Sequence, residues 1–248
     1  MNGAIHPIGW GHLALSFLPA LVTLGILWRW SLGLKKGVVA LMRMLAQLVL
    51  IGYFLAWIFG AANGVVILLV LSVMLFASSW IALGTVPACR GRLFASALLS
   101  ILLGGGLTLA LITQGVLSLE PWYLPQYMIP LAGMIFSNAM NSVSLSAERL
   151  DAELDRQPDY ETARRIAFNA SLIPVINSLL AVGLVSLPGM MTGQILSGVS
   201  PLVAARYQIM VMAMIFGSSG ISTAVFLYLS REFFQARHEA SQAQAGAE

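Results

Sequence analysis

The chain has 248 residues, of which 58% are hydrophobic and 9% are charged, and its formal net charge is +3. Soluble globular domains carry about 25% charged residues, so this composition excludes an ordinary soluble domain. No polar stretch is longer than about 20 residues, which leaves no room for a separate soluble domain. The net positive charge does not indicate nucleic-acid binding, because the basic residues are distributed as in membrane proteins.

Seven apolar runs follow one another along the chain. Each is about 19–28 residues long, which is enough for a helix to cross a hydrocarbon core of about 30 Å. The runs cover residues 10–28, 38–59, 64–84, 93–117, 125–147, 166–187 and 202–229. The sequence therefore predicts an all-α integral membrane protein with about seven transmembrane helices.

The basic residues fall on alternate connections between these runs. Of the 13 Lys and Arg residues, all except Arg206 lie near the first, third and fifth connections or in the tail. The positive-inside rule then places the N-terminus outside and the C-terminus in the cytoplasm. Residues 1–237 are predicted to form a single transmembrane domain, and the Ala-, Gln- and Glu-rich tail at 238–248 is predicted to be disordered.

The chain shows no energy source of its own. None of its 10 Asp and Glu residues lies at the centre of a predicted span, whereas proton-coupled carriers usually need an ionisable group there. Arg43 and Arg206 keep their charge at ordinary pH and cannot accept protons. The only lysines, Lys35 and Lys36, are not part of a P-loop. Uphill transport would therefore need a partner, while passive conduction and non-transport roles stay open.

Polar side chains gather in the fifth predicted span. Asn138, Asn141 and Ser142 lie at i, i+3 and i+4 and share one helical face. Met134 precedes this face by one turn, and Glu148 extends it toward the cytoplasm. Amides at membrane depth must face protein or water. They either form interhelical hydrogen bonds, worth about 0.6–2 kcal/mol each, or line a pathway.

The sixth predicted span is bent and also carries an amide. Pro174 removes one backbone hydrogen bond, and Asn177 follows about one turn later. Asn177 and Asn138 are expected either to pair with each other or to line the same pathway.

A short helix is predicted near 188–198, on the outer side. Pro188 suits its first position and Gly198 its end, and the stretch is too short to cross the membrane. It is therefore expected to be interfacial or re-entrant. Met190, Met191 and Gln194 either form an outer gate or belong to a plain connector.

Methionine occurs 12 times in the chain. Thioethers are soft ligands for ions such as Cu(I), but methionine is also a common apolar filler. Met210, Met212 and Met214 alternate at a spacing of two, so they cannot all share one helical face.

The fifth connection is the largest polar feature. Asp159 is a suitable N-cap, Glu161 suits the first turn of the next helix, and Arg164 and Arg165 follow at the membrane face. The connection is either a solvated linker or a docking element for a soluble partner.

Several of these runs together resemble the FetB-type iron-export ABC transporter permease family. The resemblance rests on Gly133-Met-Ile-x-x-Asn-Ala-Met-Asn-x-Val-Ser-Leu, Ile173-Pro-x-Ile-Asn177, Leu187-Pro-Gly-Met-Met-Thr-Gly-Gln194, Gly198-Val-Ser-Pro201 and Arg206-Tyr-Gln-Ile. It implies a multi-pass permease subunit of the bacterial inner membrane, not itself an enzyme, that exports iron or a related metal ion. It also implies a homodimer that works with a separate cytoplasmic ATPase, which holds ATP and Mg, and no cofactor in this chain.

Under this resemblance the polar residues take candidate roles, while the metal ligands stay unknown. The pathway candidates are Met134, Asn138, Asn141 and Asn177, the outer-gate candidates are Met190, Met191, Gln194 and Arg206, and the ATPase-coupling candidates are Glu148, Glu161, Arg164 and Arg165.

Two alternative functions remain open. The sparse carboxylates favour an ABC permease for an organic or lipid-like substrate, because Fe²⁺ sites usually use His and carboxylate ligands. The connection from Arg149 to Ala170 is shorter than the family pattern and lacks an Ala-Leu-Gly-Ala-type stretch. That departure favours a membrane scaffold or sensor that no longer transports.

Overall fold

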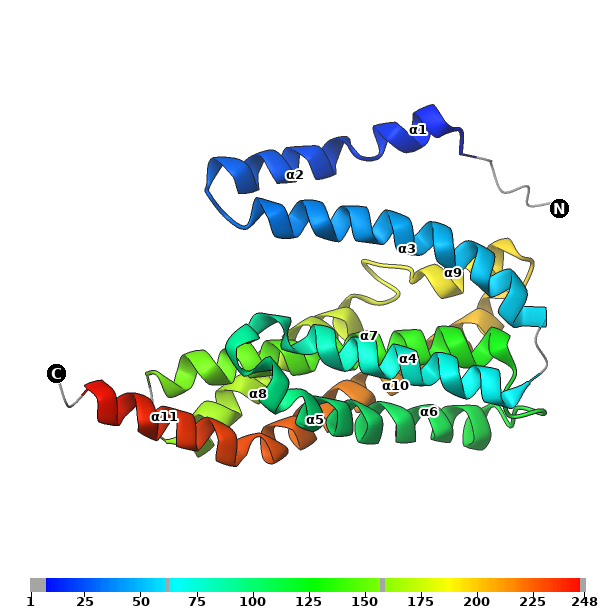
Figure 1. Ribbon diagram of the computed structural model, residues 1–248. Helices are drawn as coiled ribbons and strands as arrows, with labels where there is room; N and C mark the ends of the chain where they lie inside the picture. The colour runs from blue at the N-terminus through cyan, green and yellow to red at the C-terminus, as the bar shows by residue number, and fades with distance from the viewer. Residues whose placement is uncertain (1–7, 61–62, 157–158, 246–248) are drawn as a thin grey trace. The chain divides into compact units, whose positions relative to one another are not determined.

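The computed structural model describes residues 8–60, 63–156 and 159–245 (Figure 1). Over these residues the chain is helical, and the only β-type pairing is one isolated bridge between Val182 and Ser186. The predicted all-α class is therefore confirmed. The chain divides into two compact units, Met1–Ala61 and Ala62–Glu248.

The first unit is a helical hairpin. It contains α1 (Trp10–Leu15), α2 (Leu18–Arg29) and α3 (Leu34–Gly60). Instead of one continuous helix over 10–28, the chain breaks at Ser16–Phe17, just before Pro19, whose ring clashes with a preceding helical turn. A Cβ on Gly37 of α3 would lie 3.0 Å from Leu24 of α2, so this glycine lets the two helices approach closely.

The second unit is a bundle in which the long helices run side by side (Figure 1). Its elements are α4 (Gly64–Ala82), η1 (Leu83–Thr85), η2 (Pro87–Cys89), α5 (Arg90–Ile101), η3 (Leu102–Gly106), α6 (Leu107–Ala110), η4 (Leu111–Val116), α7 (Pro125–Leu154), α8 (Tyr160–Ala181), α9 (Gly189–Leu196), α10 (Pro201–Leu229) and α11 (Arg231–Ala245).

Local sequence signals set several of these helix ends. The Asp159 carboxylate accepts hydrogen bonds from the backbone N–H groups of Glu161 and Thr162, which confirms the predicted N-cap of α8. The Ser200 hydroxyl caps α10 in the same way, and Pro201 follows at the first position. Gly198 has a φ of +92°, a conformation that favours glycine and ends the short helix α9 as predicted.

Two predicted boundaries differ from the structure. The span expected over 166–187 is α8, which begins earlier, at Tyr160, and ends earlier, at Ala181. Residues after Ala181 turn through Gly183, whose φ is +83°. A disordered tail was expected from residue 238, but α11 is helical to Ala245, because alanine, glutamine and glutamate are strong helix formers.

Five stretches in the described residues are long and apolar enough to cross a membrane. They are Trp10–Arg29, Leu34–Phe54, Gly64–Thr85, Pro87–Val116 and Pro201–Leu229. The long helices α7 and α8 fall outside this set because they carry more polar residues. A multi-pass membrane protein is confirmed, and the count of seven crossings stays a prediction.

The helix α10 lies at the centre of the second unit. It packs against α5, η3, α7, α8 and α9. It approaches the π-helical turn η3 closely, because a Cβ on Gly104 would lie only 2.5 Å from the backbone nitrogen of Ser222 and closer still to its hydroxyl. At Gly104, therefore, only hydrogen fits against α10.

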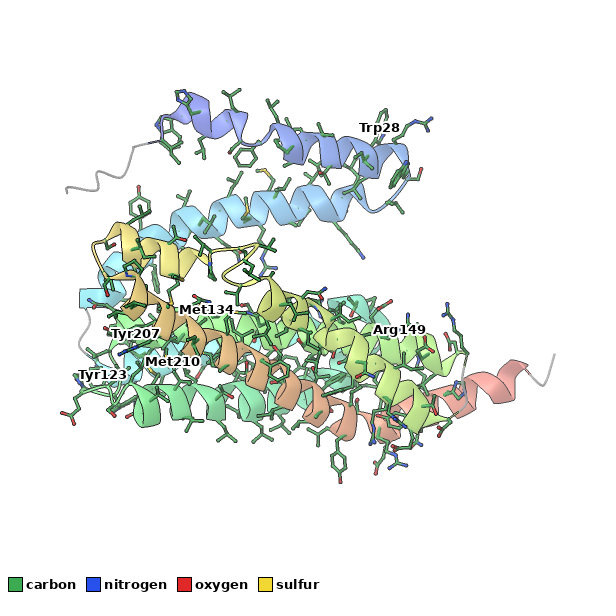
Figure 2. All side chains as sticks on the ribbon, turned by 180° about the vertical axis from the view of Figure 1, so that it is seen from behind. Trp28, Tyr123, Met134, Arg149, Tyr207 and Met210 are labelled. Atoms are coloured by element: carbon green, nitrogen blue, oxygen red, sulfur yellow. The ribbon has the colours of Figure 1, made fainter. Side chains whose placement is uncertain are left out.

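The two ends of the second unit differ in chemistry. Figure 2 shows Tyr123, Tyr207 and Met210 at one end, which we call the tyrosine end, and Arg149 at the other, the arginine end. Arg237 of α11 pairs with Asp151 of α7 and donates to the sulfur of Cys89 at the arginine end. All the arginines of this unit except Arg206 lie there, on the helix ends and turns that the sequence assigned to the cytoplasmic side.

The contact at Gly104 yields a stability prediction. Gly104→Ala is expected to cost about 1–3 kcal/mol through overpacking, which lowers Tm by roughly 2–4 °C per kcal/mol in a chain of this size. The measurement is thermal unfolding of the purified protein in detergent. Ser222→Gly should restore only part of the loss, because backbone atoms of Ser222 also lie too close.

The matched control is Gly91→Ala in α5, where a Cβ meets no atom within 4 Å. Its Tm should stay the same or rise slightly, since alanine favours a helix over glycine. Equal effects of the two substitutions would contradict the close crossing of α10 and η3.

Candidate functional site

The second unit contains a partly open cavity of about 310 Å³ between α7, α8, α10 and the segment that leads into α9. Its lining residues are Met134, Asn138, Val175, Ser178, Val182, Ser186, Pro188, Gly189, Met190, Gln208, Val211, Met212 and Ile215. The wall combines thioethers, amides and hydroxyls with small apolar groups, and no titratable side chain is among these residues.

Helical spacing explains why these side chains converge. On α7, Met134 and Asn138 are four residues apart and lie on one face. On α10, Gln208 and Met212 have the same relation. Figure 2 shows Met134 nearer to the tyrosine end than to Arg149, so the cavity lies toward the end predicted to face outward.

Gln208 is the exceptional polar residue of the cavity. Its side chain is only 5% exposed, and its Oε1 atom is buried without a hydrogen bond. A buried acceptor without a partner costs about 1–3 kcal/mol. By contrast, the Asn138 amide donates to the Met134 carbonyl at 2.8 Å, and the Ser178 hydroxyl donates to the Pro174 carbonyl at 2.9 Å.

A second cavity of about 470 Å³ adjoins the first between α8, α9 and α10. Val182, Gln208 and Met212 line both, so they form the partition between the two spaces. Met190 lines the first cavity, and its neighbour Met191 lines the second. The short helix α9 thus contributes one thioether to each.

The structure brings together only some of the predicted pathway residues. Met134 and Asn138 line the first cavity, whereas Asn141 and Asn177 are exposed and do not. The structure shows no hydrogen bond between Asn138 and Asn177: the Asn138 amide donates to the Met134 carbonyl of its own helix, and Asn177 is exposed.

The predicted gate residues separate in a similar way. Met190 and Met191 line the two cavities, and Gln194 lies half-buried one turn further along α9. Arg206 is exposed on α10, two residues before Gln208, and lines neither cavity.

Sequence reasoning missed Gln208 and Met212. A signal was present, since Gln208 is an isolated amide in an apolar run and Met212 follows at i+4. The alternation of Met210, Met212 and Met214 concealed it, because only one of these three methionines lines the cavity.

A groove of about 480 Å³ lies between α8 and α10 at the arginine end. It is lined by Arg164, Arg165, Phe168, Asn169, Ala224, Leu227 and Tyr228. Glu161 pairs with Arg164 across one helical turn, so three of the four coupling candidates are at or beside this groove. Glu148 is exposed on α7 and does not line it.

Two buried side chains hold the arginine end together. Glu153 of α7 is buried and its carboxylate lies 2.7 Å from the Arg149 guanidinium, a partner that a buried charge requires. Tyr160 is 4% exposed and its hydroxyl donates to the carbonyl of Leu227. Burial raises the pKa of Tyr160 to about 12, against lowering by the nearby charges of Arg164 and Arg231.

The cap of α8 is ionised at neutral pH. The hydrogen bonds that Asp159 accepts from the Thr162 side chain and backbone, and from the Glu161 backbone, hold its pKa below the usual value. The start of α8 is therefore set by a charged cap and by the Tyr160 contact together.

No group of three or more His, Cys, Asp or Glu side chains that could hold a metal ion occurs among the described residues.

The family model for the uncharacterised protein family UPF0014 matches residues 10–234 of the chain. The chain belongs to this family. The match covers both structural units, including every residue of the two cavities and the groove. The resemblance expected from the sequence motifs is thereby confirmed, and no solved structure matches this UPF0014 protein.

The names of similar proteins include a membrane protein and a permease. The chain is 40% identical over 184 residues to a UPF0014 membrane protein of Synechocystis sp., covering 67% of this chain and 70% of that one. It is 38% identical over 164 residues to the probable iron export permease protein FetB of Escherichia coli, covering 60% and 62%. It is 37% identical over 155 residues to Protein ALUMINUM SENSITIVE 3 of Arabidopsis thaliana, covering 56% and 55%. The matches thus span less than two thirds of the last two proteins.

The Tyr160 contact generates a prediction that needs no transport assay. Tyr160→Phe removes one buried hydrogen bond and is expected to cost about 1 kcal/mol at neutral pH. The measurement is the difference in Tm between the variant and the parent UPF0014 protein in detergent.

The pH dependence of this difference has a definite sign. The pKa of Tyr160 is raised from 10.0 to about 12, so its stabilisation is complete below pH 10 and is lost as the pH rises toward 12. The Tm difference should therefore narrow above pH 10. A difference that widens there would contradict the buried neutral hydroxyl.

Proposed function

We propose that this UPF0014 protein is the membrane-spanning permease subunit of an ABC transporter that exports iron or a related metal ion. The observation that carries the proposal is the cavity around Gln208, a polar binding space inside an apolar helical bundle. The name of the Escherichia coli relative, a probable iron export permease, supports the choice of cargo.

The proposal assigns ATP hydrolysis to a separate subunit. The sequence carries no P-loop and no ionisable residue at the centre of a predicted span, so energy for uphill export comes from a partner. A cytoplasmic ATPase with its own ATP and Mg fits this need. The groove with Arg164 and Arg165 is the part of the chain that we assign to coupling.

Coupling has a direct route in this bundle. The groove lies on α8 and α10, and the same two helices carry Ser178, Gln208 and Met212 of the cavity at their other ends. A push on the start of α8 would therefore be transmitted to the cavity along α8 and α10. The hydrogen bond from the Tyr160 hydroxyl to the Leu227 carbonyl links the two helices at the arginine end.

The proposed assembly contains two permease chains. Asn141 and Asn177 are exposed on α7 and α8, and amides at membrane depth need contact with protein or water. A second copy of the chain would cover these amides and enclose the pathway. The mass of the purified complex tests this, and one permease chain per complex would contradict it.

The function is tested with the permease and its ATPase purified together and reconstituted in vesicles. Iron on the permease's cytoplasmic face should stimulate ATP hydrolysis and move across the membrane in an ATP-dependent way. Stimulation by an organic or lipid-like molecule instead of any metal ion would favour the alternative substrate class. No stimulation by either would favour a scaffold or sensor.

The coupling residues give a separate prediction. Replacing Glu161, Arg164 and Arg165 together with Ala should abolish metal-stimulated ATP hydrolysis and transport while leaving the permease folded, since all three are at least partly exposed. Arg92→Ala is the control, because Arg92 is an exposed arginine at the same end that lies outside the groove. Unchanged stimulation in the triple variant would contradict the assigned coupling site.

A further inference from the structure

The donors of the first cavity are uncharged, and its three thioethers are soft whereas its amide oxygens are hard. Three thioethers, from Met134, Met190 and Met212, come from three different elements and meet in one space of about 310 Å³. Thioether sulfur binds soft ions such as Cu(I) and has little affinity for hard ions. Methionines that serve only as apolar packing residues often follow one face of a single helix. These three come from α7, α9 and α10 and line the same cavity.

A buried amide oxygen adds a fourth donor. The Oε1 atom of Gln208 accepts no hydrogen bond and belongs to a residue that lines both cavities. An acceptor that is buried at a cost and left without a donor is suited to a ligand that brings positive charge.

The charge of the site restricts the ion further. Neither cavity is lined by an Asp, Glu, His or Cys side chain within the described part of the chain. The Born cost of taking an ion out of water rises with the square of its charge, and uncharged donors offset it only in part. A monovalent ion is therefore favoured over Fe²⁺ or Fe³⁺, which usually take carboxylate and imidazole ligands.

We propose that the cavity formed by Met134, Met190, Met212 and Gln208 binds a soft monovalent cation of the Cu(I) class. The inference rests on the proposed function in one respect, because it takes the cargo to be the related metal ion of that proposal, of the Cu(I) class, instead of iron. Binding itself is a property of this chain and needs no ATPase.

The second cavity adjoins this binding site and would give a bound ion a route onward. Met212 and Gln208 face both spaces, and Met191 supplies a further thioether beyond them. An ion held at Met134, Met190 and Met212 can exchange the first two sulfurs for Met191 while keeping Met212. The short helix α9 thus supplies one sulfur to each of the two spaces, Met190 to the first and Met191 to the second.

The test uses Ag(I), a soft monovalent ion that does not change oxidation state under assay conditions. The full chain is purified in detergent as a Cys89→Ser variant, which removes the only thiol. Titration calorimetry should show one tight Ag(I) site. Met134→Leu, Met190→Leu, Met212→Leu and Gln208→Leu should each weaken it about tenfold or more, while Met→Leu keeps the packing volume.

Met210→Leu is the matched control, because Met210 lies on the same helix two residues before Met212 and lines neither cavity. Its Ag(I) affinity should equal that of the parent. Thermal unfolding of every variant without metal shows whether the fold is retained. Gln208→Leu should not lower Tm, because it removes a buried acceptor that has no partner.

Two results would overturn the inference. The first is an Ag(I) affinity that stays the same in all four variants. The second is Fe(II) binding, measured without oxygen, that is as tight as Ag(I) binding and is lost in the same variants. These outcomes are distinct from failure of the proposed function. If iron stimulates the ATPase complex but Ag(I) does not bind the cavity, only the inference fails. If Ag(I) binds the cavity but no metal ion stimulates the complex, only the transport proposal fails.

Discussion

The close crossing of α10 with the π-helical turn η3 is the contact on which the second unit depends. At Gly104 only hydrogen fits against Ser222, so the two backbones touch and α10 reaches the centre of the bundle. From there α10 contacts α7, α8 and α9 at once. Inside a membrane, helices gain little from hydrophobic association and rely on such close packing of small residues. The cavities and the groove all have α10 as one wall.

The same central helix carries Gln208, the polar residue that distinguishes the site. Gln208 is buried with a side-chain carbonyl oxygen that accepts no hydrogen bond, while the nearby Asn138 and Ser178 each donate a hydrogen bond to a carbonyl of their own helix. This difference leaves the Gln208 oxygen available to a ligand. The decisive property is whether each polar atom already has a partner.

The two ends of α8 and α10 differ in their chemistry, and the proposed function assigns coupling to one end and binding to the other. At the arginine end, Tyr160, Glu153 and the pair Arg237–Asp151 fix the helix ends around an arginine-lined groove. Toward the tyrosine end the walls become uncharged and rich in thioethers. Membership of UPF0014 and the named iron export relative place the chain among membrane proteins. The proposed ion class rests on the cavity chemistry, in which three thioethers and no charged side chain line the first cavity.

The sequence by itself determined the fold class, the family and several helix ends. Apolar runs fix membrane helices because of the bilayer's thickness, and the caps at Asp159 and Ser200 act on residues two or three positions away. Which residues line the cavity was decided only by the tertiary structure. Periodicity put Met134 beside Asn138, but it could not pair them with Met190 and Gln208, which are more than 50 residues away along the chain. Nor could it show that the Asn138 amide donates within α7 whereas the Gln208 Oε1 atom is buried without a partner, because burial depends on which helices pack around an atom.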